Sequence, residues 1–313
     1  LAGGVGGAKL AHGLAYHIEP SQLTIIVNTA DDFEHLGLHI SPDLDTVMYT
    51  LSGLNNHDSG WGLSGETWNF LKSLERLGGE TWFRLGDHDL ATHVERTHRL
   101  GSGEALSDIT SDFCSRLGIR VGITPMSDDL VKTVVHSDKG SLPFQDYFVR
   151  QGCEPSVRAF KFEGIAAARL SSVAREALEA PDLQAIVICP SNPYVSIRPI
   201  LDLPEVSDIL LERRLPIVAV SPIVGGQAIK GPAAKMMKEL GTQPSCHTVV
   251  EHYGGLLDGI VIDSSDSNEV AAIEASGTRV MLANIIMNSM SDKTGLAQAV
   301  LSFALNLAER DLD

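Results

Sequence analysis

Basic side chains are scarce in this 313-residue sequence, which has 24 Lys and Arg against 40 Asp and Glu and a formal net charge of −16. A nucleic-acid-binding protein needs a basic face to displace the counterions of the phosphate backbone, so the composition argues against that class. A nucleotide ligand stays open, because one small polyanion can be held by backbone N–H groups, a few basic side chains and a metal ion.

Cysteines and long apolar runs are also scarce. The four cysteines lie far apart and no pair has CxxC spacing, which argues against a zinc ribbon and for free, reduced thiols. No apolar run approaches the ~20 residues of a membrane helix, and no signal peptide is visible. We therefore expect a soluble, cytoplasmic protein with no membrane partner.

Enough of the chain is apolar, 43% of its residues, to build a sizeable core. Short β-branched runs alternate with helical patterns, which is typical of βαβ units. We predict an α/β fold with a Rossmann-like, doubly wound, mostly parallel sheet, and we expect a strand before Leu1. The predicted strands span residues 23–27, 119–123, 185–189, 217–220, 260–262 and 280–282, and the predicted helices 8–17, 47–51, 65–77, 90–100, 106–117, 204–213, 232–240 and 294–308.

One stretch departs from this alternation. Residues 131–164 read as β-rich segments joined by turn residues, and no long Pro/Gly linker separates independent domains. We therefore predict a Rossmann-like nucleotide-binding core made of residues 1–130 and 165–313, with a small β-rich insertion at 131–164.

The first residues are rich in glycine and lead into a predicted helix. Glycines let a backbone approach phosphate oxygens closely, and a helix N-terminus adds free N–H groups and a partial positive charge. Lys9 would add a full charge, but it replaces the third glycine of the dinucleotide fingerprint, and no P-loop sequence is present. The segment is either a phosphate cradle or an ordinary tight turn of an α/β sheet. The candidate nucleotide-binding residues are Gly4, Gly6, Gly7 and Lys9.

Four aspartates follow the predicted strand at 23–27: Asp31, Asp32, Asp43 and Asp45. Ligands of open α/β sheets bind at the carboxyl ends of strands, where Asp31 and Asp32 lie. Carboxylates this close repel one another unless a cation or hydrogen-bond donors share them, and Mg²⁺ binds one or two carboxylates together with phosphate oxygens. The segment is either such a site or a solvated acidic loop, with Asp43 an alternative helix N-cap.

Polar loops also follow two later strands, at the sheet edge where ligands bind. Upstream of them, Arg84 could meet an anion, while Asp87 and Asp89 are either ligands or N-caps of the next helix. Each loop is equally open to a nucleotide-binding interpretation and to ordinary loop chemistry. The candidates in these loops are Ser191, Asn192, Ser221, Pro222 and Gly225.

Ten stretches carry a resemblance to a known family: GGVGGAK (3–9), VNTADD (27–32), ISPDLDTVMYTL (40–51), WGLSGETW (61–68), RLGDHDLATH (84–93), TPMSDD (124–129), FQDYFV (144–149), PSNPYVSI (190–197), VSPIVGG (220–226) and KGPAAK (230–235). In this order they resemble the 2-phospho-L-lactate transferases of coenzyme F420 biosynthesis, including their bacterial phosphoenolpyruvate-using relatives. The resemblance extends from Gly3 to about Lys235, and the C-terminal quarter adds little to it.

The resemblance implies a transferase of a substituted phosphate group. Such enzymes join the deazaflavin alcohol Fo to a phosphorylated three-carbon acid, taken from its guanosine diphosphate ester, and release GMP with Mg²⁺ as the required ion. Asp45 and Arg84 match positions that contact Fo in this family. The resemblance further implies that Asp31 and Asp45 would hold Mg²⁺ and act in catalysis. The glycine loop and the loops with Ser191 and Ser221 would bind guanosine diphosphate.

Several points stay open at this stage. Asp45 is a metal ligand, a base or an anchor for Fo, and the acid is of the lactate, enolpyruvate or glycerate type. Aromatic residues are few, so a stacking platform for the deazaflavin is not obvious; the candidates are Trp61, Trp68 and Trp82. A homodimer is the default expectation for a soluble enzyme.

Two other functions compete with the transferase. A related group with this fold binds a nucleotide sugar in a regulatory, non-catalytic role, but there the "ADD" is followed by a Gly/Ser-rich stretch, whereas here Asp32 is followed by Phe33 and Glu34. An NAD(P)-dependent oxidoreductase is disfavoured because Lys9 replaces the third glycine and the second strand ends in paired acids.

Overall fold

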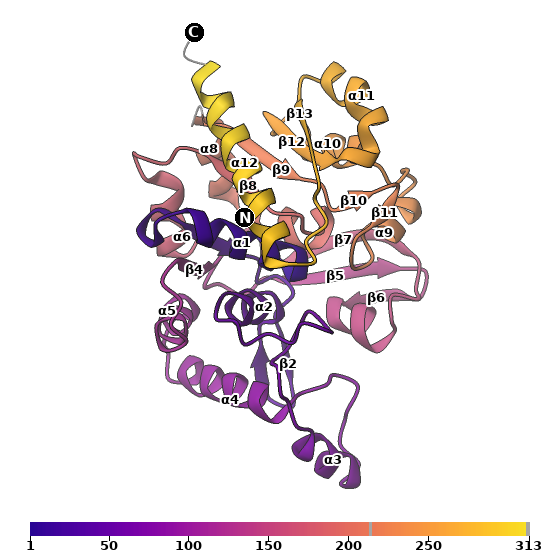
Figure 1. The fold of residues 1–313 in the computed structure, drawn as a ribbon. Helices are drawn as coiled ribbons and strands as arrows, with labels where there is room; N and C mark the ends of the chain where they lie inside the picture. Colours follow the sequence, from indigo (N-terminus) through magenta and orange to yellow (C-terminus); the bar gives the residue numbers. More distant parts are fainter. Residues whose placement is uncertain (213–214, 311–313) are drawn as a thin grey trace.

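The computed structural model describes residues 1–212 and 215–310 and has an α/β fold with parallel strands and helices packed around them (Figure 1). Four strands pair in parallel in the order β13-β12-β9-β8, and β1 pairs in parallel with β4. The predicted α/β class with a mostly parallel sheet is confirmed. The strands are β1 (Thr24–Val27), β4 (Gly122–Pro125), β8 (Ile186–Ile188), β9 (Ile217–Val220), β12 (Gly259–Asp263) and β13 (Arg279–Ala283).

The first two residues bridge these two groups of strands. The amino group of Leu1 donates to the carbonyl of Val187 at 2.6 Å. On the other side, Ala2 N–H donates to Ile26 O at 2.9 Å, and Asn28 N–H donates to Ala2 O at 3.1 Å. Leu1 and Ala2 therefore occupy the place of a parallel strand between β8 and β1, and the glycine-rich turn leaves the sheet at its carboxyl edge.

Side chains of the sheet enter two separate cores, one on each face. Every residue of β9 is buried; Ile217 and Ala219 join one core, whereas Val218 and Val220 join the other. Because successive side chains of a strand point to opposite faces, both faces of this sheet are covered. This is why the sequence signal of the strands is a continuous apolar run and not an alternation.

Helices cover both faces of the sheet. The core that contains Val218 is completed by α1 (Gly4–His17), α2 (Pro42–Leu51), α5 (Leu106–Arg116) and α12 (Met290–Arg310). The opposite core is completed by α6 (Ser172–Glu179), α7 (Arg198–Leu201), α8 (Pro204–Glu212), α9 (Ala233–Glu239), α10 (Cys246–Tyr253) and α11 (Val270–Ala275). In Figure 1, α1 and α12 pass in front of the strands, and α3 (Asn69–Arg76) and α4 (Asp87–Gly101) extend away from them.

The β-rich segment forms a second sheet. Its strands pair antiparallel in the order β6-β5-β7, and the side chains of Val135, Tyr147 and Val157 join the same core as Ile26 and Ile186. The division of the chain into a core and an insertion stays a prediction. The remaining elements are β2 (Phe33–His35), β3 (Leu38–Ile40), β5 (Lys132–Ser137), β6 (Gly140–Pro143), β7 (Val157–Glu163), β10 (Ile223–Val224), β11 (Gln227–Ala228), η1 (Pro20–Gln22), η2 (Asp146–Arg150), η3 (Pro193–Ile197) and η4 (Ser264–Glu269).

Some predicted boundaries were wrong. The strand expected at 119–123 begins only at Gly122, because Gly118 turns the chain with a φ of 73° and Ile119 N–H still bonds back to Cys114 O. The helix expected at 65–77 begins at Asn69. Helices α6, α7, α10 and α11 were not predicted. Arg213, the expected end of α8, lies outside the described residues.

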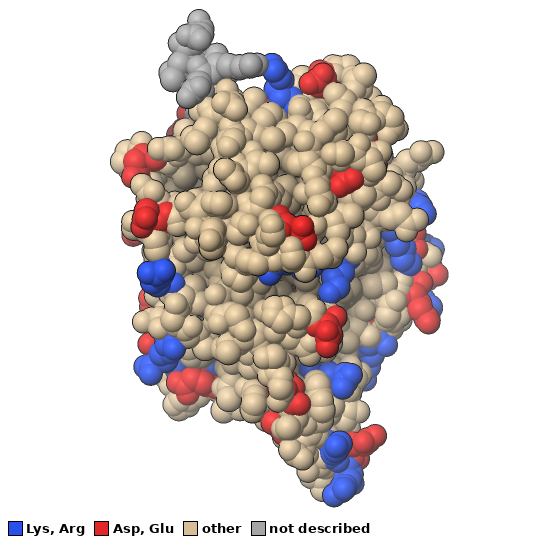
Figure 2. Space-filling view, viewed as in Figure 1, with Lys and Arg blue, Asp and Glu red and all other residues tan. Residues whose placement is uncertain are grey.

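Within residues 1–212 and 215–310, no helix has the length and apolar character needed to cross a membrane. Acidic and basic side chains are interspersed over the face in Figure 2, and neither sign forms a broad patch there.

Candidate functional site

A cavity of about 610 Å³ lies at the carboxyl ends of β1 and β8. Its lining comes from the start of α1, the first turns of α2, the α4 residues Asp89 and His93, and several loops. Of the residues predicted from the sequence, Gly7, Ser221 and Gly225 do not line it. Those that do are Gly4, Gly6, Lys9, Asp31, Asp45, Arg84, Ser191, Asn192 and Pro222.

The glycine-rich turn packs directly on the loop that follows β8. The hydroxyl of Ser191 accepts from Gly3 N–H at 3.1 Å and donates to Gly3 O at 2.8 Å. A Cβ at Gly6 would lie 2.1 Å from Pro190 O, and one at Gly7 would lie 2.7 Å from Ser191 Oγ. Gly6 and Gly7 are therefore required for the close approach of the first turn of α1 to the loop after β8, which is a packing reason that the sequence alone did not reveal.

A Gly6→Ala substitution is expected to destabilise the fold by about 1–3 kcal/mol, the usual cost of overpacking, because the carbonyl of Pro190 is backbone and cannot move aside cheaply. Gly295→Ala is the matched control: it also lies in a helix, is exposed and would meet no atom within 4 Å. Urea denaturation measures both variants. A Gly6→Ala protein as stable as Gly295→Ala would contradict the packing argument.

The first turn of α1 presents unpaired N–H groups to the cavity. Gly4 N–H donates to Asp43 Oδ1 at 2.7 Å. The N–H groups of Val5 and Gly6 belong to the same first turn, which has no intrahelical acceptors, and in the described part of the chain no other acceptor is seen for them. Lys9 follows on the same helix, and its ammonium donates to Met287 O at 2.7 Å. This end of the cavity suits an anion.

The other nucleotide-binding candidates hold loops in place. Asn192 Oδ1 accepts from Tyr194 N–H at 2.9 Å and so caps η3. The hydroxyl of Ser221 is buried and bonds to both Ile223 O and Ile223 N–H, each at 3.0 Å. Gly225 N–H donates to the carboxylate of Asp266 at 2.9 Å. Ser221 and Gly225 thus shape the loop after β9 from behind the cavity.

Asp31 and Asp43 form a buried carboxyl pair in the cavity. Asp43 Oδ2 accepts from Asn28 Nδ2 at 3.0 Å, and burial raises the pKa of Asp43 to about 6. Burial, followed by the nearby Asp43, raises the pKa of Asp31 well above its usual value. Asp31 Oδ1 has no hydrogen-bond partner within the described residues. The pair calls for a shared proton or a cation.

The expectation of an N-cap at Asp43 was wrong. The N-cap position of α2 is Ser41, and Asp43 lies inside the first turn. The Ser41 hydroxyl does not cap the helix either, because it donates to Asp32 Oδ2 at 2.6 Å, and the same oxygen lies 3.1 Å from His39 Nε2. Asp32 is thereby drawn away from the cavity, which it does not line.

Asp45 is held by a buried arginine that sequence reasoning missed. Arg96 is completely buried, and its two terminal nitrogens donate to both oxygens of Asp45, Nη1 to Oδ2 at 3.1 Å. His93 Nδ1 lies 3.7 Å from the same Oδ2. A signal was present, since Asp89, His93 and Arg96 are spaced four and three residues apart and so share one face of α4.

Asp89 continues this buried network. Its Oδ1 accepts from the Tyr49 hydroxyl at 2.7 Å, and its Oδ2 lies 3.4 Å from His93 Nε2. Asp89 was a candidate N-cap, but α4 starts earlier, with Gly86 at the N-cap position. The carboxylate of Glu66 instead receives the N–H of Asp89, at 2.7 Å.

Asp87 also caps a helix, but not its own. It accepts from Asn69 N–H at 3.1 Å and from Phe70 N–H at 3.0 Å, the first residues of α3. These hydrogen bonds, with that of the Thr67 hydroxyl first among them, lower the pKa of Asp87. Since Glu66 caps α4 and Asp87 caps α3, the two helix starts are cross-linked, which explains why α3 begins later than the sequence predicts.

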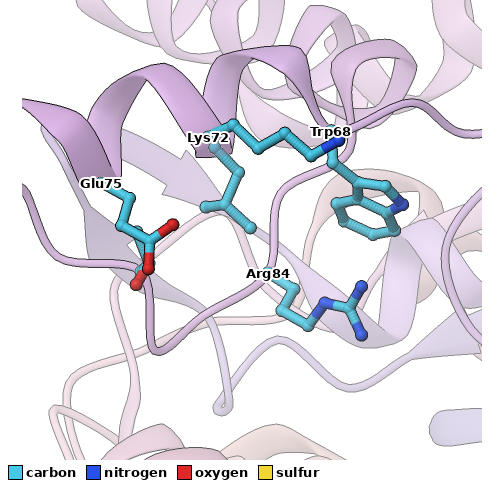
Figure 3. Close-up of a pocket in the computed structure, with 6 residues that line it drawn as sticks. Trp68, Lys72, Glu75 and Arg84 are labelled. Atoms are coloured by element: carbon cyan, nitrogen blue, oxygen red, sulfur yellow. The ribbon is translucent and has the colours of Figure 1, made fainter.

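Arg84 lies between the main cavity and a second, smaller hollow of about 320 Å³ (Figure 3). Its guanidinium stacks on Trp68 at 4.3 Å from the ring centroid, and Figure 3 shows Lys72 of α3 reaching toward the same ring. No ion pair of Arg84 or Lys72 with a carboxylate is found in the described ranges. Arg84 is therefore free to meet an anionic group at the cavity.

One wall of the main cavity is aromatic. Trp61 and Trp82 line it, whereas Trp68 lines only the smaller hollow. Sequence reasoning overlooked the phenylalanines that complete this wall, because they come from two distant segments. Trp82 and Phe83 meet at 5.8 Å between ring centroids, and Phe144 and Phe148 stack at 5.4 Å; all four line the cavity.

Within the described residues, no three or more His, Cys, Asp or Glu side chains are arranged to hold a metal ion. The predicted ligands Asp31 and Asp45 both line the cavity. Their surroundings differ, because Arg96 binds both oxygens of Asp45 whereas Asp31 keeps an unpaired oxygen. By donor chemistry a divalent cation fits better at Asp31 and Asp43 than at Asp45.

Comparisons with known proteins agree with this geometry. A solved structure of a UPF0052 family member from Bacillus halodurans superimposes with a TM-score of 0.63 over 96% of this chain and 97% of its own, at 16% identity, which supports the fold alone. The phosphoenolpyruvate transferase of Streptomyces griseus is 38% identical over 310 residues, 97% of either chain. The 2-phospho-L-lactate transferase of Methanococcoides burtonii is 37% identical over 98% of this chain and 99% of its own. The family model of the 2-phospho-L-lactate transferase CofD matches residues 1–294, so the chain belongs to this family of transferases.

Proposed function

We propose that the protein transfers a phosphorylated three-carbon acid from its guanosine diphosphate ester to a hydroxyl of the deazaflavin Fo and releases GMP, as a step of coenzyme F420 biosynthesis. The acid is 2-phospholactate or phosphoenolpyruvate, the two named in the transferases that this chain resembles. The observation that carries the proposal is one cavity that is lined by an anion-binding helix start, an aromatic wall and a pair of buried carboxyls.

The anion-binding end suits the diphosphate of the donor. The unpaired N–H groups of Val5 and Gly6 and the ammonium of Lys9 all lie on the first turns of α1. A helix N-terminus favours phosphate oxygens through its N–H groups and its dipole. The loop at Pro190 and Ser191, which packs against this turn, would form the other side of the nucleotide site.

The aromatic wall suits the flat, tricyclic acceptor. Trp82, Phe83, Phe144 and Phe148 offer ring faces and edges against which a deazaflavin can pack. Arg84, next to this wall and without a carboxylate partner in the described residues, would bind a polar edge of Fo. In this proposal the acceptor would lie on the α4 side of the cavity and the donor on the α1 side.

Mg²⁺ fits the proposal at Asp31, with Asp43 as the second carboxylate. When bound, the ion supplies positive charge that neutralises the diphosphate. Asp45, tied to Arg96, is fixed in position and better suited to anchor the attacking hydroxyl than to ligate metal. The chain's own contribution is mainly to orient the two substrates and exclude water, which is how phosphoryl-type transfers are chiefly catalysed.

The reaction itself tests the proposal. Purified protein is mixed with Fo, Mg²⁺ and the guanylylated phospho-acid, and the deazaflavin product and GMP are followed by chromatography. Separate lactate, enolpyruvate and glycerate donors identify the acid by the rate of consumption. No product with any donor would overturn the proposal, and tight binding of UDP-sugars without turnover would favour the regulatory alternative.

An Arg84→Ala substitution is expected to raise the KM for Fo about tenfold, because it removes a charged contact worth roughly 1.4 kcal/mol. Binding of GDP, measured by calorimetry, should be unchanged, since Arg84 lies away from α1. Arg76→Ala on α3 is the matched control, because Arg76 is exposed and does not line the cavity. A KM for Fo equal to that of the unsubstituted protein would remove Arg84 from the acceptor site.

A further inference from the structure

A cluster of basic side chains lies where α1 meets α12. Lys9 and His12 are three residues apart on α1 and so share a face. Lys293, in the first turn of α12, places its ammonium 3.5 Å from His12 Nδ1. Only Lys9 of these three lines the main cavity. The cluster therefore extends from the cavity along the α1–α12 contact.

Lys293 is the least accessible member, with only 9% of its surface exposed. A second ammonium lies nearby: burial lowers the pKa of Lys293, and Lys9 lowers it further. Burial likewise lowers the pKa of His12, with additional effects of Lys293 and His57. No carboxylate pairs with Lys9, His12 or Lys293 anywhere in residues 1–212 and 215–310.

A buried ammonium without a carboxylate partner lowers the stability of the ligand-free protein. A buried ammonium is normally paired with a carboxylate, since leaving it unpaired forfeits its hydration without compensation. The sequence has 40 acidic residues, yet none of those in the described part of the chain forms an ion pair with this cluster. The hydrogen-bonding groups that do meet the cluster are a histidine ring and, at Lys9, the carbonyl of Met287.

A fourth basic residue, Lys230, lines the main cavity close to this cluster. Lys230 donates to Ser59 O at 2.7 Å, and a Cβ at Gly60 would meet both the Lys230 ammonium and Val5. Lys230 therefore lies above the first turn of α1, next to the N–H groups assigned above to the donor phosphates. A path of positive charge runs from the N-terminus of α1 to Lys293.

We propose that Lys9, His12 and Lys293 form an oxyanion subsite that binds a phosphate or carboxylate group of the donor beyond the groups held by the α1 N-terminus. The inference rests on the proposed function for the identity of the donor, but not for the presence of the subsite. The bound oxyanion supplies the negative charge that the chain itself does not place beside Lys293.

Lys293→Met tests the subsite, because methionine keeps the apolar stem and removes the charge. The probes are inorganic phosphate, GDP and phosphoenolpyruvate, measured by calorimetry and by the thermal shift each produces. We expect about tenfold weaker binding of the oxyanion that occupies the subsite, equal to roughly 1.4 kcal/mol, and unchanged binding of guanosine. The ligand-free variant should melt no lower than the unsubstituted protein, since the buried charge that it loses has no carboxylate partner in the described residues.

Two further variants make the test specific. Lys293→Arg should retain most of the oxyanion affinity, and Lys139→Met, on an exposed turn between β5 and β6, should change nothing. The three probes separate the sources: loss with GDP alone assigns the subsite to a nucleotide phosphate, and loss with phosphoenolpyruvate to the acid. Affinities for all three probes within twofold of the unsubstituted protein would overturn the subsite, whether or not the transfer reaction is observed.

Discussion

An Arg96→Met protein is expected to have a free energy of unfolding about 3–5 kcal/mol lower than the unsubstituted chain, the usual cost of removing one partner of a buried ion pair. Arg96 is completely buried and binds both oxygens of Asp45, which is itself 5% exposed. Without the guanidinium, Asp45 would keep a buried charge beside His93, whose Nδ1 lies 3.7 Å from its Oδ2. Urea denaturation with a constant m-value measures the loss.

The control for this result is Arg116→Met. Arg116 also pairs with an aspartate, Asp112 at 2.8 Å, but its side chain is 74% exposed. Exposed pairs contribute at most about 1 kcal/mol, so this variant should be nearly neutral. A double substitution of Arg96→Met with Asp45→Leu should recover much of the stability, because an apolar pair replaces the ionic one. An Arg96→Met protein as stable as Arg116→Met would contradict the assignment.

An Asp31→Asn protein is expected to be more stable at pH 7 than the unsubstituted chain and yet to lose activity by about 100-fold or more, the order seen when one electrostatic group of a site is removed. Asp31 is buried beside Asp43 with one oxygen unpaired in the described structure. Asparagine removes the repulsion but also the charge proposed to hold Mg²⁺. Thermal melting and the transfer assay measure the two effects, with the exposed Asp182→Asn as control.

The stability effect should depend on pH in a definite direction. Burial raises the pKa of Asp43 from 3.8 to about 6, and that of Asp31 is raised as well. Between pH 3.8 and about 6, Asp43 holds a proton more often in the folded state than in the unfolded state. The contribution of the pair to the free energy of unfolding therefore falls as the pH rises from about 4 to 6. The gain of Asp31→Asn should therefore be larger at pH 7 than at pH 4. An equal gain at both values would show that charge repulsion is not its cause.

The fold was largely predictable because its strands are short apolar runs that bury on both faces. Ile217 to Val220 is such a run, and its structure is the predicted one. Helix α3 was misplaced because its start is set by Asp87, 18 residues away in sequence from Asn69. Local patterns carry no information on a cap that comes from another helix.

The sequence predicted which chain segments line the cavity, but not which of their side chains contact one another. Sequence position brought Gly4, Asp31 and Ser191 to one cavity, since each follows a segment of the sheet that ends at the same edge. That Arg96 would meet Asp45, 51 residues earlier, depends on how α4 lies against α2. The role of Gly6 in making room for Pro190 likewise appears only when two loops distant in sequence are brought together.

The capping hydrogen bonds of Glu66 and Asp87 link the starts of α3 and α4 to each other. Each helix is held at its start by a carboxylate from the stretch that begins the other, so neither can tilt without pulling on its neighbour. Arg84 lies on the segment between them and stacks on Trp68, the residue just before α3. We therefore expect α3, α4 and the stacked Arg84 to move together whenever this side of the cavity changes shape.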